Sequence, residues 1–365
     1  MALTQVNLGM VDTAAAGGLG MRNRIINGAM EIDQRNAGAS VTLTNGTDQY
    51  CVDRYKFYRD VGGTFTAQQS STAPAGFSTS MVITASTGAS PSASQLNFVK
   101  QDIEGFNVAD LKWGTSDAKD ITISFWIRSS VTGAYAISVA NNSLGRSYVT
   151  EVTVSSANTW EQKSVTIPGD TSGTWTTNNT AGIRLYLDLG SGSDYNATVN
   201  TWASAWDCRT SSSVTWGATT GATLYITGVQ LEVGSVATEF ERRPYGTELQ
   251  LCQRYYYQMN CYGTGSDNFY GRFVGIAETG TNVIFSMFWP SGEMRTTPTA
   301  SYSGSLRMDD YYSANNPAGT FTSGNLTKWG GILQVSVASG SFTQGRTIRL
   351  LMNSTVGSLN FSAEL

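Results

Sequence analysis

The densest group of side chains that could do chemistry lies between residues 202 and 216. It combines aromatic rings with one acidic and one basic side chain. These residues are Trp202, Trp206, Asp207, Arg209 and Trp216. The apolar C–H face of a sugar ring stacks on a flat aromatic ring, and neighbouring charged groups bind its hydroxyls. We therefore predict a glycan-binding site here. The competing interpretation is that these aromatic residues close the end of a core.

Catalytic residues are harder to find. The chain has no histidine, which excludes Ser-His-Asp and Cys-His catalysis and every metal site that needs a histidine ligand. A glycosidase instead needs two carboxylates at a set separation. The acidic candidates are Asp188, Asp194, Asp207, Asp309 and Asp310. Because such residues are common on ordinary surfaces, we expect no enzyme activity, no cofactor and no metal site.

Charge and composition narrow the class further. The net charge is −4, and the only adjacent basic pair that stands out is Arg242–Arg243, so we do not expect a nucleic-acid partner. Charged residues make up 14% of the chain, against about 25% in typical soluble domains. Glycine and short polar residues take their place, and these suit strands and tight turns better than helix surfaces. The composition therefore favours an all-β protein.

The ends of the chain and its cysteines suggest where it is made. No apolar run approaches the ~20 residues that span a bilayer, and the first residues lack the basic start of a secretory signal. We expect synthesis in a cytoplasm without membrane insertion. The cysteines, Cys51, Cys208, Cys252 and Cys261, form no CxxC pair and are predicted to be buried thiols.

Alternation of apolar and polar residues predicts many short strands. Residues 120–129, 182–190 and 223–234 each alternate with a period of two, as a half-buried strand does. Turn residues separate such segments, as at Asn27–Gly28. Apolar residues continue on both sides of Gly228, which predicts a bulge or bend. This pattern predicts a jelly-roll-like β-sandwich rather than alternating strands and helices.

One helix is predicted at residues 247–258, with Thr247 and Gln250 as a capping box. Leu249, Cys252 and Tyr256 are spaced to share one face. That face would pack either on its own chain or on copies of itself, as the seam of an oligomer. We divide the chain into an extended N-terminal arm (1–24), a sandwich (25–244), a helical linker (245–258) and a smaller C-terminal β-domain (259–365). The arm is too poor in large apolar groups to fold alone, so we expect it to anchor the chain to a partner.

Several stretches of the sequence resemble a widespread group of bacteriophage tail-fibre and virion structural proteins. They are INGAMEIDQRNAG (26–38), YCVDRYKFYR (50–59), residues 101–135, 147–175 and 226–258, and the weaker echo MRTTPT (294–299). The resemblance implies a sandwich like that of carbohydrate-binding modules, a second domain, a place in the virion and a homotrimer. It carries over no binding residues.

Three functions remain open from the sequence. The first is a tail-fibre protein that attaches to a glycan on the host surface. The second is a purely structural adaptor, collar or capsid-decoration protein, held by the arm to other virion proteins. The third is a polysaccharide depolymerase, which the missing histidines disfavour.

Overall fold

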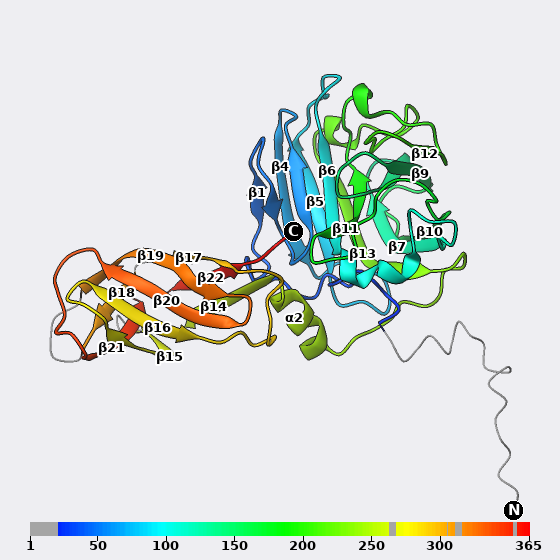
Figure 1. The fold of residues 1–365 in the computed structure, drawn as a ribbon. Coiled ribbons are helices and arrows are strands. Elements are labelled where there is room, and N and C mark those ends of the chain that lie inside the picture. Colours follow the sequence, from blue (N-terminus) through cyan, green and yellow to red (C-terminus); the bar gives the residue numbers. More distant parts are fainter. Residues whose placement is uncertain (1–20, 263–267, 305, 311–315, 353–355) are drawn as a thin grey trace, which may run out of the picture. The chain divides into compact units, whose positions relative to one another are not determined.

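A computed structural model describes residues 21–262, 268–304, 306–310, 316–352 and 356–365. The chain divides into two compact units between Arg243 and Pro244, each of which is built from antiparallel sheets (Figure 1). This confirms the predicted all-β fold. Among the described helices, none has the length and apolar character needed to cross a membrane.

The first unit is a sandwich of two sheets. Sheet A has the order β1-β4-β5-β13-β7-β10, and sheet B has the order β12-β9-β8-β11-β6-β3-β2. The strands of sheet A are β1 (Val41–Leu43), β4 (Thr64–Ser70), β5 (Ser80–Thr87), β13 (Ala222–Val233), β7 (Ile121–Ser129) and β10 (Glu161–Ile167). Those of sheet B are β12 (Trp202–Ala203), β9 (Ser147–Val154), β8 (Gly133–Ala140), β11 (Ala181–Asp188), β6 (Asn97–Glu104), β3 (Lys56–Arg59) and β2 (Gln49–Tyr50). Short 3-10 helices punctuate the loops: η3 (Gly105–Asn107), η4 (Ala109–Leu111), η5 (Ser193–Tyr195) and η6 (Trp216–Ala218).

The apolar residues of the predicted alternation form the core between these two sheets. On β7, Ile121, Ile123 and Phe125 are buried against the facing sheet, as their spacing indicates. The bulge predicted at Gly228 is also present. The pairing of β13 with β7 shifts register between Thr227 and Gln230, and Gly228 has a φ of 62°, which glycine adopts without strain.

The start of the described chain is bound to β13. The backbone N–H of Arg24 donates to Leu231 O at 2.9 Å, and Val229 N donates to Gly28 O at the same distance. The Asn23 side chain is buried and donates to Val229 O. Most of the predicted arm (1–24) lies outside the described residues, but its last residues belong to the sandwich, because they complete this edge of β13.

The helical linker is shorter than predicted. Helix α2 runs from Tyr245 to Gln253 with Pro244 as its N-cap, and the cap makes no side-chain hydrogen bond. The capping box at Thr247 and Gln250 was therefore wrong. Tyr256 already lies in strand β14, where its hydroxyl donates to Asn360 Oδ1 at 3.0 Å. Leu249, Cys252 and Tyr256 consequently do not form one helical stripe, and the predicted seam is not present as a helix face.

The second unit pairs a closed barrel with a three-stranded sheet. The barrel order is β15-β16-β20-β19-β18-β21, and the sheet order is β14-β22-β17. A shared core includes Phe285, Leu333, Leu350 and Phe361. The strands are β14 (Tyr256–Tyr262), β15 (Asn268–Ala277), β16 (Asn282–Met287), β17 (Thr299–Ser303), β18 (Leu306–Asp309), β19 (Asn316–Thr327), β20 (Gly330–Val337), β21 (Thr347–Met352) and β22 (Val356–Ser362).

Candidate functional site

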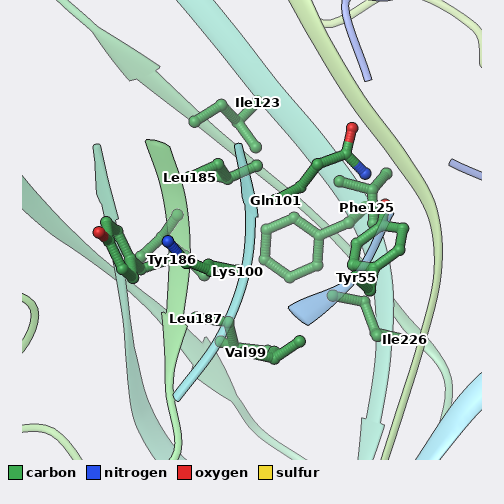
Figure 2. Close-up of a pocket in the computed structure, with 12 residues that line it drawn as sticks. Tyr55, Val99, Lys100, Gln101, Ile123, Phe125, Leu185, Tyr186, Leu187 and Ile226 are labelled. Atoms are coloured by element: carbon green, nitrogen blue, oxygen red, sulfur yellow. The ribbon is translucent and has the colours of Figure 1, made fainter. Parts of the chain in front are cut away.

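The face of sheet B that points away from the core carries aromatic and charged residues in rows. Where β6 pairs with its two neighbours, Lys100 lies opposite Tyr186 of β11 and Lys56 of β3. One step along, Phe98 lies opposite Tyr58 of β3. The intervening residues of these strands face the core, so the two faces of β3, β6 and β11 have different chemistry. Figure 2 shows Lys100 and Tyr186 on the opposite side of their strands from the core residues that line an apolar gap between the sheets.

Five aromatic rings gather on this outer face, and we call them the aromatic cluster. Phe98 is in contact with three others: Tyr58 at 5.8 Å, Tyr186 at 5.0 Å and Trp206 at 6.0 Å between ring centroids. Trp206 also meets Tyr195 at 5.3 Å. Phe98 and Tyr186 are buried, whereas Tyr58, Tyr195 and Trp206 are half-exposed. The cluster therefore presents the rings of three aromatic side chains over a packed floor.

A charged network continues the face beside the aromatic cluster. Lys100 Nζ lies 2.9 Å from Asp102 Oδ2, and both side chains are buried. Lys56 Nζ and Arg184 Nε each lie 4.0 Å from the Asp102 carboxylate. Arg184 Nη2 also donates to Asn142 Oδ1 at 2.8 Å. Donors and acceptors for sugar hydroxyls thus lie next to the rings.

Burial sets the protonation of this face. It lowers the pKa of the Lys100 ammonium, an effect that the ion pair with Asp102 opposes. Burial also raises the pKa of the phenols of Tyr58, Tyr186 and Tyr195. These hydroxyls therefore stay protonated at neutral pH and remain available as hydrogen-bond donors.

The loop between β11 and β13 covers one side of the face. On β8 the outward residues Ala136, Ser138 and Ala140 are small and buried, which leaves room for a covering segment. Trp206 packs there against Phe98 and Tyr186. The loop thereby places the indole of Trp206 at one edge of the aromatic cluster, and Tyr58 lies at the opposite edge.

Of the five residues predicted to bind a glycan, Trp206 and Asp207 lie at this face. Asp207 is half-exposed, its N–H donates to Ser147 Oγ at 3.0 Å, and burial raises the pKa of its carboxyl. Trp202 belongs to a different group. Its ring lies 5.4 Å from Trp113 and 5.7 Å from Trp175, and its indole N–H donates to Pro168 O at 3.1 Å.

The remaining two predicted residues, Trp216 and Arg209, are buried and contribute to the fold. Trp216 is fully enclosed in the core at 0% exposure, with its ring 6.2 Å from Phe65. It was wrongly assigned to the glycan site, since no ligand can reach its ring. Arg209 is buried and donates to the carbonyl oxygens of Ser191, Thr210 and Ser213. These hydrogen bonds hold the covering loop in place. Among the described residues, no hydrogen bond joins Arg209 to the aromatic cluster.

Three of the candidate carboxylates form hydrogen bonds or ion pairs within the fold. Asp188 is buried and accepts hydrogen bonds from the backbone N–H groups of Gly190 and Ser191. Asp309 pairs with Arg349 at 2.6 Å, and Asp310 pairs with Arg346 at 3.0 Å. Each of these carboxylates therefore already has a partner within the fold.

Sequence reasoning missed most of the face, namely Tyr58, Phe98, Lys100, Asp102, Arg184 and Tyr186. The alternation predicts the inward residues of β11 and says nothing of what its outward residues do. A usable signal was present, because Tyr186 and Tyr58 are large aromatic residues on the polar side of their strands. Both rings meet Phe98, which depends on the pairing of β6 with β3 and with β11, segments that are far apart in the sequence.

No family model and no curated protein matches this sequence. Solved structures with distant likeness include the enzymatically active domain of bacteriophage CBA120 tailspike protein 4 (TM-score 0.30, 11% identity, 58% of this chain and 22% of that one). The matched part is about a fifth of that tailspike chain. Others are TmCBM61 in complex with β-1,4-galactotriose (0.30, 11%, 59% and 100%) and the family 11 carbohydrate-binding module from Clostridium thermocellum (0.29, 14%, 56% and 100%). Likenesses at this level carry no weight for a ligand.

Proposed function

We propose that this chain is a structural protein of a bacteriophage particle, in a tail fibre, whose sandwich binds a glycan on the host surface without catalysing a reaction. The observation that carries the binding role is the aromatic cluster. Tyr58, Tyr195 and Trp206 offer partly exposed rings beside the Lys56–Asp102–Arg184 network. Rings over a firm floor with polar groups at their edge suit a pyranose, which has apolar faces and a rim of hydroxyls.

A glycan array probed with the purified chain tests this role. Trp206→Ala and Tyr58→Ala should each weaken binding of the selected glycan by roughly fivefold, since stacking on one ring contributes on the order of 1 kcal/mol. Phe106→Ala is the matched control, because Phe106 is 61% exposed in the same unit and outside the cluster. Equal binding by all three variants would contradict the proposal. Failure to bind any glycan would favour the purely structural alternative, and release of sugar from host polysaccharide would favour the depolymerase.

The place in the virion rests on the sequence resemblance and is tested directly. Antibodies raised against the sandwich should decorate fibres on intact phage and should block adsorption to the host. Decoration of the capsid or collar without an effect on adsorption would instead support an adaptor or decoration protein.

Self-association as a homotrimer is part of the same proposal. On the barrel, Val274 and Ile276 of β15 are exposed at 62% and 52%, and Ile276 lies opposite Ile284 of β16. Val274 and Ile276 lie on the same face of β15, beside the half-buried Ile284, and together they form the apolar surface from which we propose self-association. Analytical ultracentrifugation of the chain should give a trimer, and Val274→Lys with Ile276→Lys should reduce its mass. A monomeric wild type would contradict this part of the proposal.

A further inference from the structure

The sandwich also has a groove, at the end where β6 begins and β11 ends. It has a volume of about 370 Å³, is partly open to solvent, and lies between residues 90–93, 191–196 and 209–215. The groove does not include the rings of the aromatic cluster. Its size falls in the range of small-molecule sites, which is about 300–1,000 Å³.

The lining of the groove combines polar and apolar surface in about equal parts, and Pro91 and Ala93 supply some of the apolar part. Hydroxyl and amide side chains supply polar groups, and they come from Ser90, Ser191, Ser193, Asn196, Ser211 and Thr215. Arg209 is the one charged residue in the described lining, and that lining contains neither an aromatic ring nor a carboxylate. A metal cation would find no anionic ligand in this described lining. A ligand rich in hydroxyls matches this chemistry.

Arg209 supplies donors at the floor of the groove. Its guanidinium is 7% exposed. Nε donates to Thr210 O at 3.3 Å, Nη2 donates to Ser213 O at 3.1 Å, and Nη1 donates to Ser191 O. An arginine has five N–H groups, so two remain for an acceptor beyond these carbonyls. Hydrogen bonds to a charged donor are among the stronger ones.

The walls of the groove are held in place by each other. Gly192 N donates to Gln95 O at 2.6 Å, and Asp194 N donates to Ala93 O at 3.0 Å. The two loops approach so closely that a Cβ on Gly192 would lie 2.1 Å from Ser92 O. A groove with fixed walls loses little conformational entropy when a ligand binds.

We propose that this groove binds one sugar unit through hydrogen bonds and without stacking on an aromatic ring, as a second subsite beside the aromatic cluster. The inference rests on the proposed glycan-binding function and extends it. Residues 193–196 link the two regions, because Ser193 and Asn196 line the groove while Tyr195 packs on Trp206. An oligosaccharide would thus be recognised by stacking at one unit and by its hydroxyl pattern at another.

Saturation-transfer NMR with D-glucose, D-galactose and N-acetylglucosamine as probes tests the groove. Because the aromatic cluster can bind a sugar by itself, the groove is tested in the Trp206→Ala background. Ser211→Trp fills the groove, and Ser156→Trp is the matched control, since both serines are exposed loop residues. The double variant Trp206→Ala, Ser156→Trp should show transfer to at least one sugar, and Trp206→Ala, Ser211→Trp should not. Persistent transfer in Trp206→Ala, Ser211→Trp overturns the groove, as does the absence of transfer from all three sugars in the wild type.

A second variant tests the groove independently, in case Ser211→Trp does not fold. Ser193→Ala with Asn196→Ala removes two hydrogen-bonding groups without adding bulk, and should weaken the same sugar by roughly tenfold. Unchanged affinity in this variant overturns the inference. If Trp206→Ala abolishes transfer and the groove variants do not, the sugar binds at the aromatic cluster alone, so the inference fails and the proposed function stands.

Discussion

The two units of the chain use aromatic side chains in different ways. In the sandwich many of them are enclosed or half-enclosed in contact with one another, as in the aromatic cluster around Phe98, although Phe106 is 61% exposed. In the barrel, Phe288 is 82% exposed and Trp329 is 60% exposed. Trp329 lies in the two-residue turn between β19 and β20, where polar residues and glycine are usual. Lys328 Nζ lies over its ring at 4.4 Å.

This difference shows that aromatic content alone does not locate a binding site. Enclosed rings within the sandwich stabilise the fold, whereas rings at the rim of the outer face can also meet a ligand. In the second unit Phe285 and Phe361 belong to the core, and the exposed rings of Phe288 and Trp329 contribute little to it. Substitutions in the two units should therefore separate stability from binding, and the expected effects fall from core to surface.

The largest effect is expected at Trp216. Trp216→Ala should lower the free energy of unfolding of the sandwich by about 3–5 kcal/mol, because it removes a fully enclosed ring and leaves a cavity. Urea denaturation followed by circular dichroism measures this change. A loss below about 1 kcal/mol would mean that the end of the sandwich relaxes around the cavity, and would weaken the contrast between enclosed and exposed rings.

The next effect depends on pH and on the loop that encloses Asp188. Burial raises the pKa of the Asp188 carboxyl from its usual value of 3.8 to about 6. The neutral form is favoured in the folded state, so this stabilisation is complete below about pH 4 and is lost as pH rises through about 6. The loss is on the order of 3 kcal/mol.

Asp188→Asn removes this titration. Its free energy of unfolding should rise relative to that of the wild type between pH 4 and pH 7. Thermal denaturation of both proteins across this range measures the difference. Parallel pH profiles would show that Asp188 is more hydrated than its enclosure indicates.

A smaller effect is expected in the charged network. Lys100→Met leaves the buried Asp102 carboxylate without its 2.9 Å partner, which should destabilise the sandwich by roughly 1–3 kcal/mol. Adding Asp102→Asn should recover part of that loss, since the uncompensated charge is then removed. Urea denaturation of the single and double variants measures both. If the double variant is no better than the single one, Lys56 and Arg184 already compensate the carboxylate.

The smallest effect is expected at the barrel turn. Trp329→Ser should change the free energy of unfolding of the barrel by less than about 0.5 kcal/mol, because an exposed ring loses little contact. Differential scanning calorimetry at several protein concentrations measures it. A larger loss that grows with concentration would indicate that another copy of the chain covers the turn.

The sequence predicted the parts of the fold that depend on local pattern. The alternation in β7, the bulge at Gly228 and the turn at Asn27 all follow from neighbouring residues. The end of the helix was missed because its tyrosines suit a strand as well as a helix, and the pairing of Tyr256 with Ser362 decides between them.

The candidate site was only partly predictable for the same physical reason. Trp206 and Asp207 stood out because they are close in sequence to other aromatic and charged residues. The rest of the face forms where β3, β6 and β11 pair, and no local pattern encodes that pairing. Trp216 was misassigned because sequence proximity to Trp206 says nothing about which side of the sheet a ring occupies.

The bonds of residues 22–28 to β13 and to residues 241–243 have a mechanical consequence. The described chain enters the sandwich beside the point where it leaves, since Arg243 Nη1 donates to Ile25 O at 3.0 Å and Arg22 N donates to Glu241 Oε1 at 3.1 Å. Tension along the chain would be carried by these bonds and by β13 of sheet A. The outer face belongs to sheet B, so it would keep its shape while the chain is pulled.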